Sequence, residues 1–183
     1  MKLIETKNYD ELSRVAADML ISEIKAKPDC VLGLATGSTP IGTYDKLIEA
    51  YKSNEVSFAK VKSINLDEYV GISWSNTESY RYFMNELLFD HVDIDKTNTH
   101  VPNGLAGDLD EECARYDALY DQIGPVDIQV LGIGLNGHIG FNEPGTSLSA
   151  PTHIVKLSDS TRQANSRNFT SLDAVPYLSL IHI

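Results

Sequence analysis

The stretch "CVLGLATGSTPIGTYDKL", residues 30–47, decides the fold. It opens on a near-continuous apolar run, "CVLGLA", which is typical of a strand covered on both faces. A turn of glycine, serine and threonine follows, and Pro40 is well placed to begin a helix. A strand, a turn and a helix in this order form the repeating unit of a parallel sheet.

The same alternation extends in both directions from this stretch. Upstream, "MKLIE" at residues 1–5 predicts a short strand, and a stripe of apolar residues at three-and-four spacing predicts a helix that stops at Pro28. Downstream, "VKSINL" (residues 61–66) and "VDIQVLGIG" (residues 126–134) are two more apolar runs, which we expect to be strands. Helical periodicity lies between and beside these runs, at residues 41–51, 79–89 and 110–123.

This order predicts an α/β fold with an open, doubly wound, mostly parallel sheet and helices on both faces, a Rossmann-like architecture. The chain has 183 residues, of which 42% are hydrophobic, so it can bury a sizeable core. No repeat, low-complexity tract or linker divides it. We therefore expect residues 1–183 to form a single domain.

Charge and cysteine content exclude several classes of function. The net charge of −11 repels phosphate backbones and anionic lipid headgroups, so neither nucleic acid nor a membrane is expected as a partner. Cys30 and Cys113 are far apart and form no CxxC pair, which argues against a zinc knuckle or a disulfide framework. No apolar segment is long enough to be a signal peptide or to span a bilayer, and we expect a cytoplasmic protein.

Three unusual stretches each begin where a predicted strand ends. They are "ATGSTP", "LDEYVG" and "GIGLNGHIGFNEPG". In open parallel sheets the ligand crevice lies beyond the carboxyl ends of the strands. The three stretches are therefore expected to face one pocket.

The first stretch has the composition of a phosphate cradle. Gly37 lets the backbone approach a ligand closely, Thr36, Ser38 and Thr39 offer hydroxyls, and the N-terminus of the following helix favours an anion. The stretch lacks the GxxxxGK[ST] and GxGxxG patterns of nucleotide and dinucleotide sites. An ordinary strand-to-helix turn with a Ser/Thr cap is the alternative.

The second stretch places Asp67 and Glu68 directly after an apolar strand. Such an acidic pair is commonly a solvated turn or a helix cap. Its position at the predicted crevice also allows a carboxylate that transfers a proton as a general base.

The third stretch combines glycines with His138 and Glu143. Histidine is the side chain best suited to gain and lose a proton under physiological conditions, and the glutamate is able to accept that proton or orient the ring. A metal site is the competing functional reading, but HExxH is absent and no second histidine is near. A glycine-rich turn whose histidine only binds backbone is the structural alternative.

Four motifs in order resemble one family. "LGLATGSTPIGTY", "NLDEYVG", "GIGLNGHIGFNEPG" and "STRQANSR" have the order and spacing seen in glucosamine-6-phosphate deaminases, and the resemblance runs to about Pro176. The 6-phosphogluconolactonases, a sister family on the same fold, share a glycine-rich loop with a GH pair but not the "FNEPG" found here. The presence of "FNEPG", residues 141–145, therefore favours the deaminases.

The resemblance implies conversion of glucosamine 6-phosphate and water to fructose 6-phosphate and ammonia. By resemblance, Asp67 is the base that moves a proton from C2 to C1, His138 opens the sugar ring and Glu143 supports His138. The phosphate is expected at the "TGST" loop and at Arg167, whose guanidinium suits it. The sugar phosphate is the expected partner, and no metal or organic cofactor is implied.

Two departures from the family pattern stand out. Asn136 occupies a position where many members have aspartate; some members from Gram-positive bacteria share the asparagine, whose amide orients His138 without a charge. After "SLDAVP" the chain continues as "YLSLIHI", residues 177–183, which matches nothing in the family. We expect a truncated chain with an unrelated tail, a sheet that is incomplete at its C-terminal side, and weak or no turnover.

Two rival functions remain open at this point. One is a lactone hydrolase acting on phosphosugars, which would leave Asp67 without an isomerase role. The other is a sugar-phosphate binding module without catalysis. The sequence leaves the oligomeric state unknown.

Overall fold

A parallel sheet forms the centre of the computed structural model, which describes residues 2–134, 137–147 and 149–182. Its strands are β1 (Val31–Leu34), β2 (Lys62–Asn65), β4 (Thr99–His100) and β5 (Ile128–Gln129), in the order β4-β2-β1-β5. All three pairings are parallel. The buried strands β1 and β2 are the apolar runs that predict them, and the parallel sheet is confirmed.

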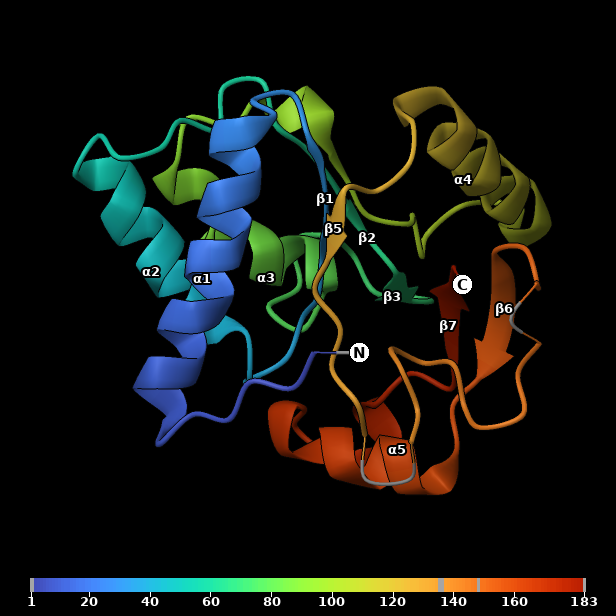
Figure 1. Ribbon diagram of the computed structural model, residues 1–183. Helices are drawn as coiled ribbons and strands as arrows, with labels where there is room; N and C mark the ends of the chain where they lie inside the picture. Colours follow the sequence, from blue (N-terminus) through green and yellow to red (C-terminus); the bar gives the residue numbers. More distant parts are fainter. Residues whose placement is uncertain (1, 135–136, 148, 183) are drawn as a thin grey trace.

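Helices cover both faces of this sheet, as predicted (Figure 1). On one face lie α1 (Tyr9–Ala26), α2 (Ile41–Lys52) and α3 (Tyr80–Leu87), which share the largest hydrophobic core with β1. On the other face lies α4 (Leu109–Ile123), whose buried Tyr116 packs against Val31 and Ile64. Short 3-10 turns, at Phe89–His91 and Lys96–Asn98, connect α3 to β4.

A second, antiparallel sheet adjoins the first and was not predicted. It contains β3 (Asp67–Tyr69), β7 (Leu178–Ile181) and β6 (His153–Lys156), in the order β3-β7-β6. Between β6 and β7 lie α5 (Asp159–Asn165) and the 3-10 turns Ser166–Asn168 and Leu172–Ala174. The second sheet begins only one residue after β2 ends, so it lies at the carboxyl edge of the first.

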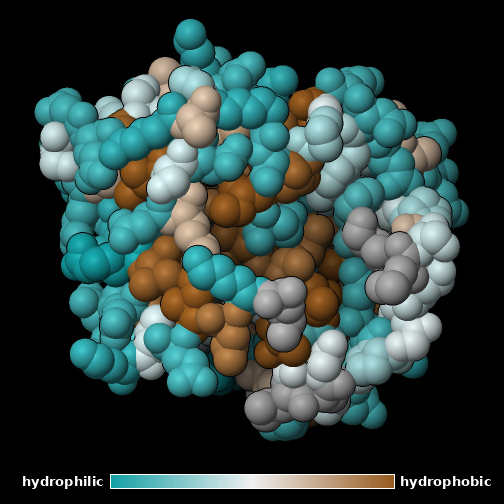
Figure 2. Space-filling view, in the orientation of Figure 1, coloured by the Kyte–Doolittle hydropathy of each residue, from teal (hydrophilic) through white to brown (hydrophobic). Residues whose placement is uncertain are grey.

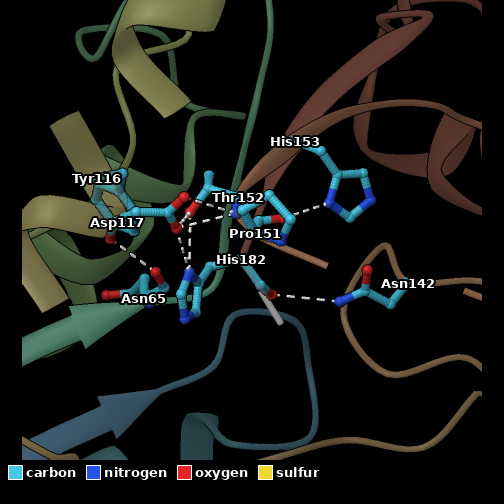
Figure 3. Close-up of polar contacts among 8 residues, drawn as sticks. All are labelled: Asn65, Tyr116, Asp117, Asn142, Pro151, Thr152, His153 and His182. Carbon is cyan, nitrogen blue, oxygen red and sulfur yellow. Dashed lines mark hydrogen bonds and ion pairs between the residues drawn. The ribbon is translucent and has the colours of Figure 1, made fainter. Parts of the chain in front are cut away.

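Residues 177–182 belong to this second sheet and its surroundings. Leu180 and Ile181 of β7 are fully buried. Beyond the strand, Nδ1 of His182 lies 3.2 Å from Oδ1 of Asp117 and 2.9 Å from the Thr152 hydroxyl (Figure 3). Nδ2 of Asn142 donates to the carbonyl of His182 over 3.3 Å. The unrelated origin expected for residues 177–183 stays a prediction, as does the single domain.

The strand predicted at residues 1–5 is wrong for the part that is described. Residues 2–5 lie in no strand, and Leu3 is 76% exposed. Among the described residues no strand pairs with them, and the edges of the parallel sheet are β4 and β5. A short apolar run without a partner strand gains neither ladder hydrogen bonds nor burial.

Apolar residues gather in the middle of the face along which β5 runs (Figure 2). Leu131 and Ile133, which follow β5, are 48% and 78% exposed. Beside them a cavity of about 490 Å³ is bordered by apolar side chains that include Leu66, Tyr120 and Val126. Among the described residues, no helix combines the length and apolar character that a membrane span requires.

Candidate active site

A cavity of about 480 Å³ lies beyond the carboxyl ends of β1, β2 and β5. Its lining includes the loop 36–39 after β1, Asp67 after β2, and Gly132–Gly134 and His138 after β5. Helix α3 contributes Tyr80, and the segment that begins with α5 contributes Thr161, Ala164, Asn165 and Arg167. The three loops predicted to face one pocket therefore do so. A volume of this size suits a small metabolite.

Most of the predicted site residues line this cavity. They are Thr36, Gly37, Ser38, Thr39, Asp67, His138 and Arg167. Glu143 is absent from that lining; it borders the neighbouring cavity of about 490 Å³ and accepts a hydrogen bond from Thr161 of the lining. Asn136 lies outside the described residues.

Tyr9 and Tyr44 hold the loop 36–39 in place. The backbone N–H of Gly42 donates to the Tyr9 hydroxyl over 2.8 Å, and that hydroxyl donates to the Thr39 carbonyl over 2.9 Å. The buried Tyr44 hydroxyl donates to the Ala35 carbonyl. Within the loop Gly37 has φ +108°, and nothing lies within 4 Å of where a Cβ would be, so its backbone is open to the cavity. The glycine therefore serves the left-handed turn.

Asp67 is buried, with 8% of its surface exposed. Burial, followed by the neighbouring charge of Glu68, raises the pKa of the Asp67 carboxyl to about 7, against a smaller lowering by a hydrogen bond from the Phe141 backbone. Gly140 lies against the carboxylate with φ +58°, and a Cβ on it would come within 3.0 Å of Asp67 Oδ2. A carboxylate that titrates near neutrality suits proton transfer from carbon.

Glu68 has a different environment from its neighbour. It is fully buried and its carboxylate accepts hydrogen bonds from the first turn of α3. The sequence left open whether the acidic pair caps a helix or serves as a base. Glu68 caps α3, whereas Asp67 faces the cavity.

His138 and Glu143 are both partly buried on the glycine-rich loop, and they border different cavities. The His138 ring covers Gly134, where a Cβ would fall 2.3 Å from Cε1 and from Nε2. The Gly134 N–H also donates to the His138 carbonyl over 2.8 Å. Oε1 of Glu143 accepts hydrogen bonds from the hydroxyls of Thr161 (3.0 Å) and Ser158 (3.2 Å).

The two arginines of "STRQANSR" have separate environments. Arg162 is buried, donates to the carbonyls of Leu172 and Val175, and stacks over the Tyr177 ring. Arg167 is exposed and borders the cavity. Only Arg167 is therefore available to an anion there.

Comparison with known proteins agrees with this geometry. The sequence profile described as "Glucosamine-6-phosphate isomerases/6-phosphogluconolactonase" matches residues 5–173. A glucosamine-6-phosphate deaminase of Geobacillus sp. (strain WCH70) is 56% identical over 176 residues, which are 96% of this chain and 70% of the relative. The chain belongs to the glucosamine-6-phosphate deaminase family.

Solved structures of glucosamine-6-phosphate deaminases and 6-phosphogluconolactonases share this fold. The structure of a monomeric glucosamine-6-phosphate deaminase superposes with a TM-score of 0.97 at 50% identity, covering 100% of this chain and 76% of the other. The 6-phosphogluconolactonase of Thermotoga maritima gives a TM-score of 0.75 at 18% identity, covering 99% and 75%, and shares the fold alone.

Four side chains beside the cavity of this deaminase-family chain were missed by sequence reasoning. They are Tyr9, Tyr80, Thr161 and Asn165. Thr161 and Asn165 belong to the motif "STRQANSR", in which the resemblance assigns a role to Arg167 alone. The sequence around Tyr80, residues 79–89, indicates a helix but no site. Tyr9 contacts the loop through a hydrogen bond to Thr39, thirty residues away in the sequence. Within the described ranges, no three histidine, cysteine, aspartate or glutamate side chains come together as a metal site requires.

Proposed function

We propose that this protein converts glucosamine 6-phosphate and water to fructose 6-phosphate and ammonia. The observation that carries the proposal is a buried carboxyl, Asp67, whose pKa is raised to about 7 and which shares one cavity with His138, the loop 36–39 and Arg167. The membership of the chain in the deaminase family supports the same reaction.

The first step is ring opening, in which His138 moves a proton from the anomeric hydroxyl to the ring oxygen. The C1–O5 bond of the hemiacetal breaks, so that C1 becomes the open-chain aldehyde and O5 becomes the C5 hydroxyl. Glu143 orients or charges His138 from behind, where two hydroxyls hold its carboxylate. Asn136 is proposed to orient the same ring.

Isomerisation and hydrolysis follow. Asp67 takes the C2 proton while the C1 oxygen gains one, which gives an enolamine. Asp67 then returns the proton to C1, the C1 oxygen remains a hydroxyl, and the C2–N bond becomes an iminium double bond. Water adds to C2, ammonia leaves, and the ketone of fructose 6-phosphate remains. Each step is a proton transfer, an addition or an elimination.

The loop 36–39 and Arg167 are proposed to hold the phosphate. A protein with a net charge of −11 needs a local group of donors to bind a dianion. The cavity lining offers the hydroxyls and backbone of the loop 36–39 and the guanidinium of Arg167. Arg167→Ala should weaken binding of glucosamine 6-phosphate about tenfold or more, with little effect on glucosamine itself. Arg14→Ala, which removes an exposed charge of α1 outside the cavity lining, is the matched control.

Ammonia release from glucosamine 6-phosphate tests the reaction. Asp67→Asn should lower the rate on the order of 10² to 10⁴-fold and should stop deuterium uptake from solvent at C1. Binding of the sugar phosphate, measured by calorimetry, should persist in this variant. Binding by the unmodified chain without any turnover would support the module reading instead, and hydrolysis of 6-phosphogluconolactone without ammonia release would support the lactonase. The weak turnover expected from the sequence is tested by the same assay and stays a prediction.

A further inference from the structure

Glu68 lies beside the proposed base, on the opposite face of the same strand. In β3 the side chains of adjacent residues alternate, so Asp67 turns toward the cavity and Glu68 turns toward α3. Glu68 is 0% exposed. A buried carboxylate outside the cavity is costly unless its oxygens find donors.

Four donors surround this carboxylate. Oε1 accepts from the backbone N–H groups of Tyr69 (2.9 Å) and Tyr80 (3.0 Å). Oε2 accepts from the Ser79 hydroxyl (2.7 Å) and the Arg81 N–H (3.1 Å). Two carboxylate oxygens have about four acceptor sites, so these donors fill them and leave no place for a proton. Burial raises the pKa of Glu68, and the hydrogen bonds oppose that rise.

The hydrogen bonds also fix the start of α3. Ser79 is the N-cap residue of this helix, and a negative charge near a helix N-terminus is favourable. The helix begins at Tyr80, whose ring lines the cavity and stacks on Phe141 with centroids 5.8 Å apart. Glu68 therefore determines where the Tyr80 ring stands relative to Asp67.

The charge of Glu68 acts on both Asp67 and Arg81. The side chain of Arg81 donates to Thr99 rather than to Glu68, so the guanidinium does not pair with the carboxylate. Apart from this arginine, the titratable groups that face the acidic pair are Tyr69 of β3, Tyr80 of α3, Tyr116 and Tyr120 of α4, and His138 of the glycine-rich loop.

We propose that Glu68 is a positioning residue, whose carboxylate holds the first turn of α3, and with it Tyr80, against β3, and whose fixed negative charge makes Asp67 a stronger base. The proposal rests on the function proposed above in so far as Asp67 is the base. The effect of the Glu68 charge on the Asp67 carboxyl does not depend on whether the protein turns over a substrate.

Glu68→Gln tests the charge. Carbon-13 NMR of the aspartate carboxyl groups, with the Asp67 signal identified by its loss in Asp67→Asn, gives the Asp67 titration directly. In Glu68→Gln the midpoint should move to lower pH by on the order of one unit, as expected for a like charge removed from a buried neighbour. The acid limb of kcat/KM for ammonia release should move by the same amount.

Ser79→Ala is the matched control, because it removes one donor to Glu68 and keeps the charge. It should lower the midpoint of thermal unfolding but leave the Asp67 titration within a few tenths of a unit. An unmoved Asp67 midpoint in folded Glu68→Gln, or an equal shift in both variants, would overturn the proposal. A shift in the titration without any ammonia release would leave it standing and count against the proposed function alone.

A measurement on the unmodified protein covers the case in which Glu68→Gln does not fold. The Glu68 carboxyl carbon should show no protonation of its own between pH 6 and 8 while Asp67 titrates. Uptake of a proton by Glu68 in that range would overturn the fixed charge.

Discussion

The Thr161 hydroxyl donates a 3.0 Å hydrogen bond to Oε1 of Glu143, and so joins α5 to the glycine-rich loop. Ser158, the N-cap residue of α5, donates both to the same oxygen and to the Thr161 hydroxyl, over 3.2 and 2.8 Å. Glu143 is thus held from the helix side while Thr161 borders the cavity.

Thr161→Val should therefore slow ammonia release about tenfold. Valine keeps the shape but removes the donor, and a hydrogen bond to a charged group contributes roughly 1.5 to 3 kcal/mol. Steady-state assays at saturating glucosamine 6-phosphate measure the effect. Ser166→Ala, which removes a hydroxyl bonded only to the Gln163 carbonyl, should leave the rate near normal. Equal rates in Thr161→Val and the unmodified protein would show that Glu143 needs no help from α5.

Gly140→Ala should lower both stability and activity. The left-handed backbone at φ +58° costs an L-residue about 1 to 2 kcal/mol, and the new Cβ would press on Asp67 Oδ2 and Ile181 Cδ1, each 3.0 Å away. Thermal unfolding and ammonia release check the two effects. Gly107→Ala, at a position with nothing within 4 Å of the added Cβ, should change little. Similar results for the two variants would contradict a close approach of Gly140 to the base.

Tyr9→Phe should weaken phosphate binding through the loop 36–39. The hydroxyl both accepts from Gly42 and donates to Thr39, and one net hydrogen bond contributes roughly 0.5 to 1.5 kcal/mol. KM for glucosamine 6-phosphate should rise about three- to tenfold with kcat little changed. Tyr51→Phe is the control, since no described residue hydrogen-bonds to that hydroxyl. A fall in kcat at constant KM would assign Tyr9 to a different role.

Asp67→Asn should stabilise the fold more at pH 8 than at pH 5. The folded pKa is about 7 against an ordinary value of 3.8, so the folded state binds more protons than the unfolded chain between these values. The stability contributed by Asp67 is full below about pH 4 and is lost as the pH rises through 7. The pH-dependent part should be on the order of a few kcal/mol, because one unit of pKa shift is about 1.4 kcal/mol.

Urea unfolding of both proteins at pH 5 and 8 measures this difference. Asp127→Asn is the opposite control: the hydrogen bond from Lys27 lowers the pKa of Asp127, so it is ionised in both states throughout this range. Its effect on stability should not vary between pH 5 and 8. A pH-independent effect of Asp67→Asn would show that Asp67 titrates in its ordinary range.

Local patterns predicted the parts of the fold that depend on neighbours in sequence. Burial within a single element explains the apolar runs around β1 and β2 and the apolar stripe of α1. The acidic first turn of α4 likewise depends only on that helix. The convergence of three loops followed from strand direction alone. The antiparallel sheet escaped prediction because β3 pairs with β7, more than a hundred residues away, and a three-residue strand has no period of its own.

The sequence likewise predicted only part of the candidate site. Residues with distinctive chemistry in a glycine-rich setting, such as His138 and the loop 36–39, could be named from sequence. The separate environments of Asp67 and Glu68 could not, because they depend on which face of β3 meets α3. Tyr9 was equally hidden, since it reaches the loop from a helix that carries no motif.

Asp67 opens β3, which pairs with β7 and places Asp67 opposite Ile181. The pairings of β1 with β2 and of β2 with β4, by contrast, close loops of about thirty to forty residues, as Val31 opposite Lys62 and Ser63 opposite Thr99 do. Long loops close later than short ones because more chain entropy is lost before any contact forms. During folding, the part of the parallel sheet formed by β4, β2 and β1 is therefore expected to assemble first, and the carboxylate to reach its final surroundings in one of the last events. Amide hydrogens of β3 should then exchange with solvent faster than those of β1, although only one residue separates β3 from the parallel sheet.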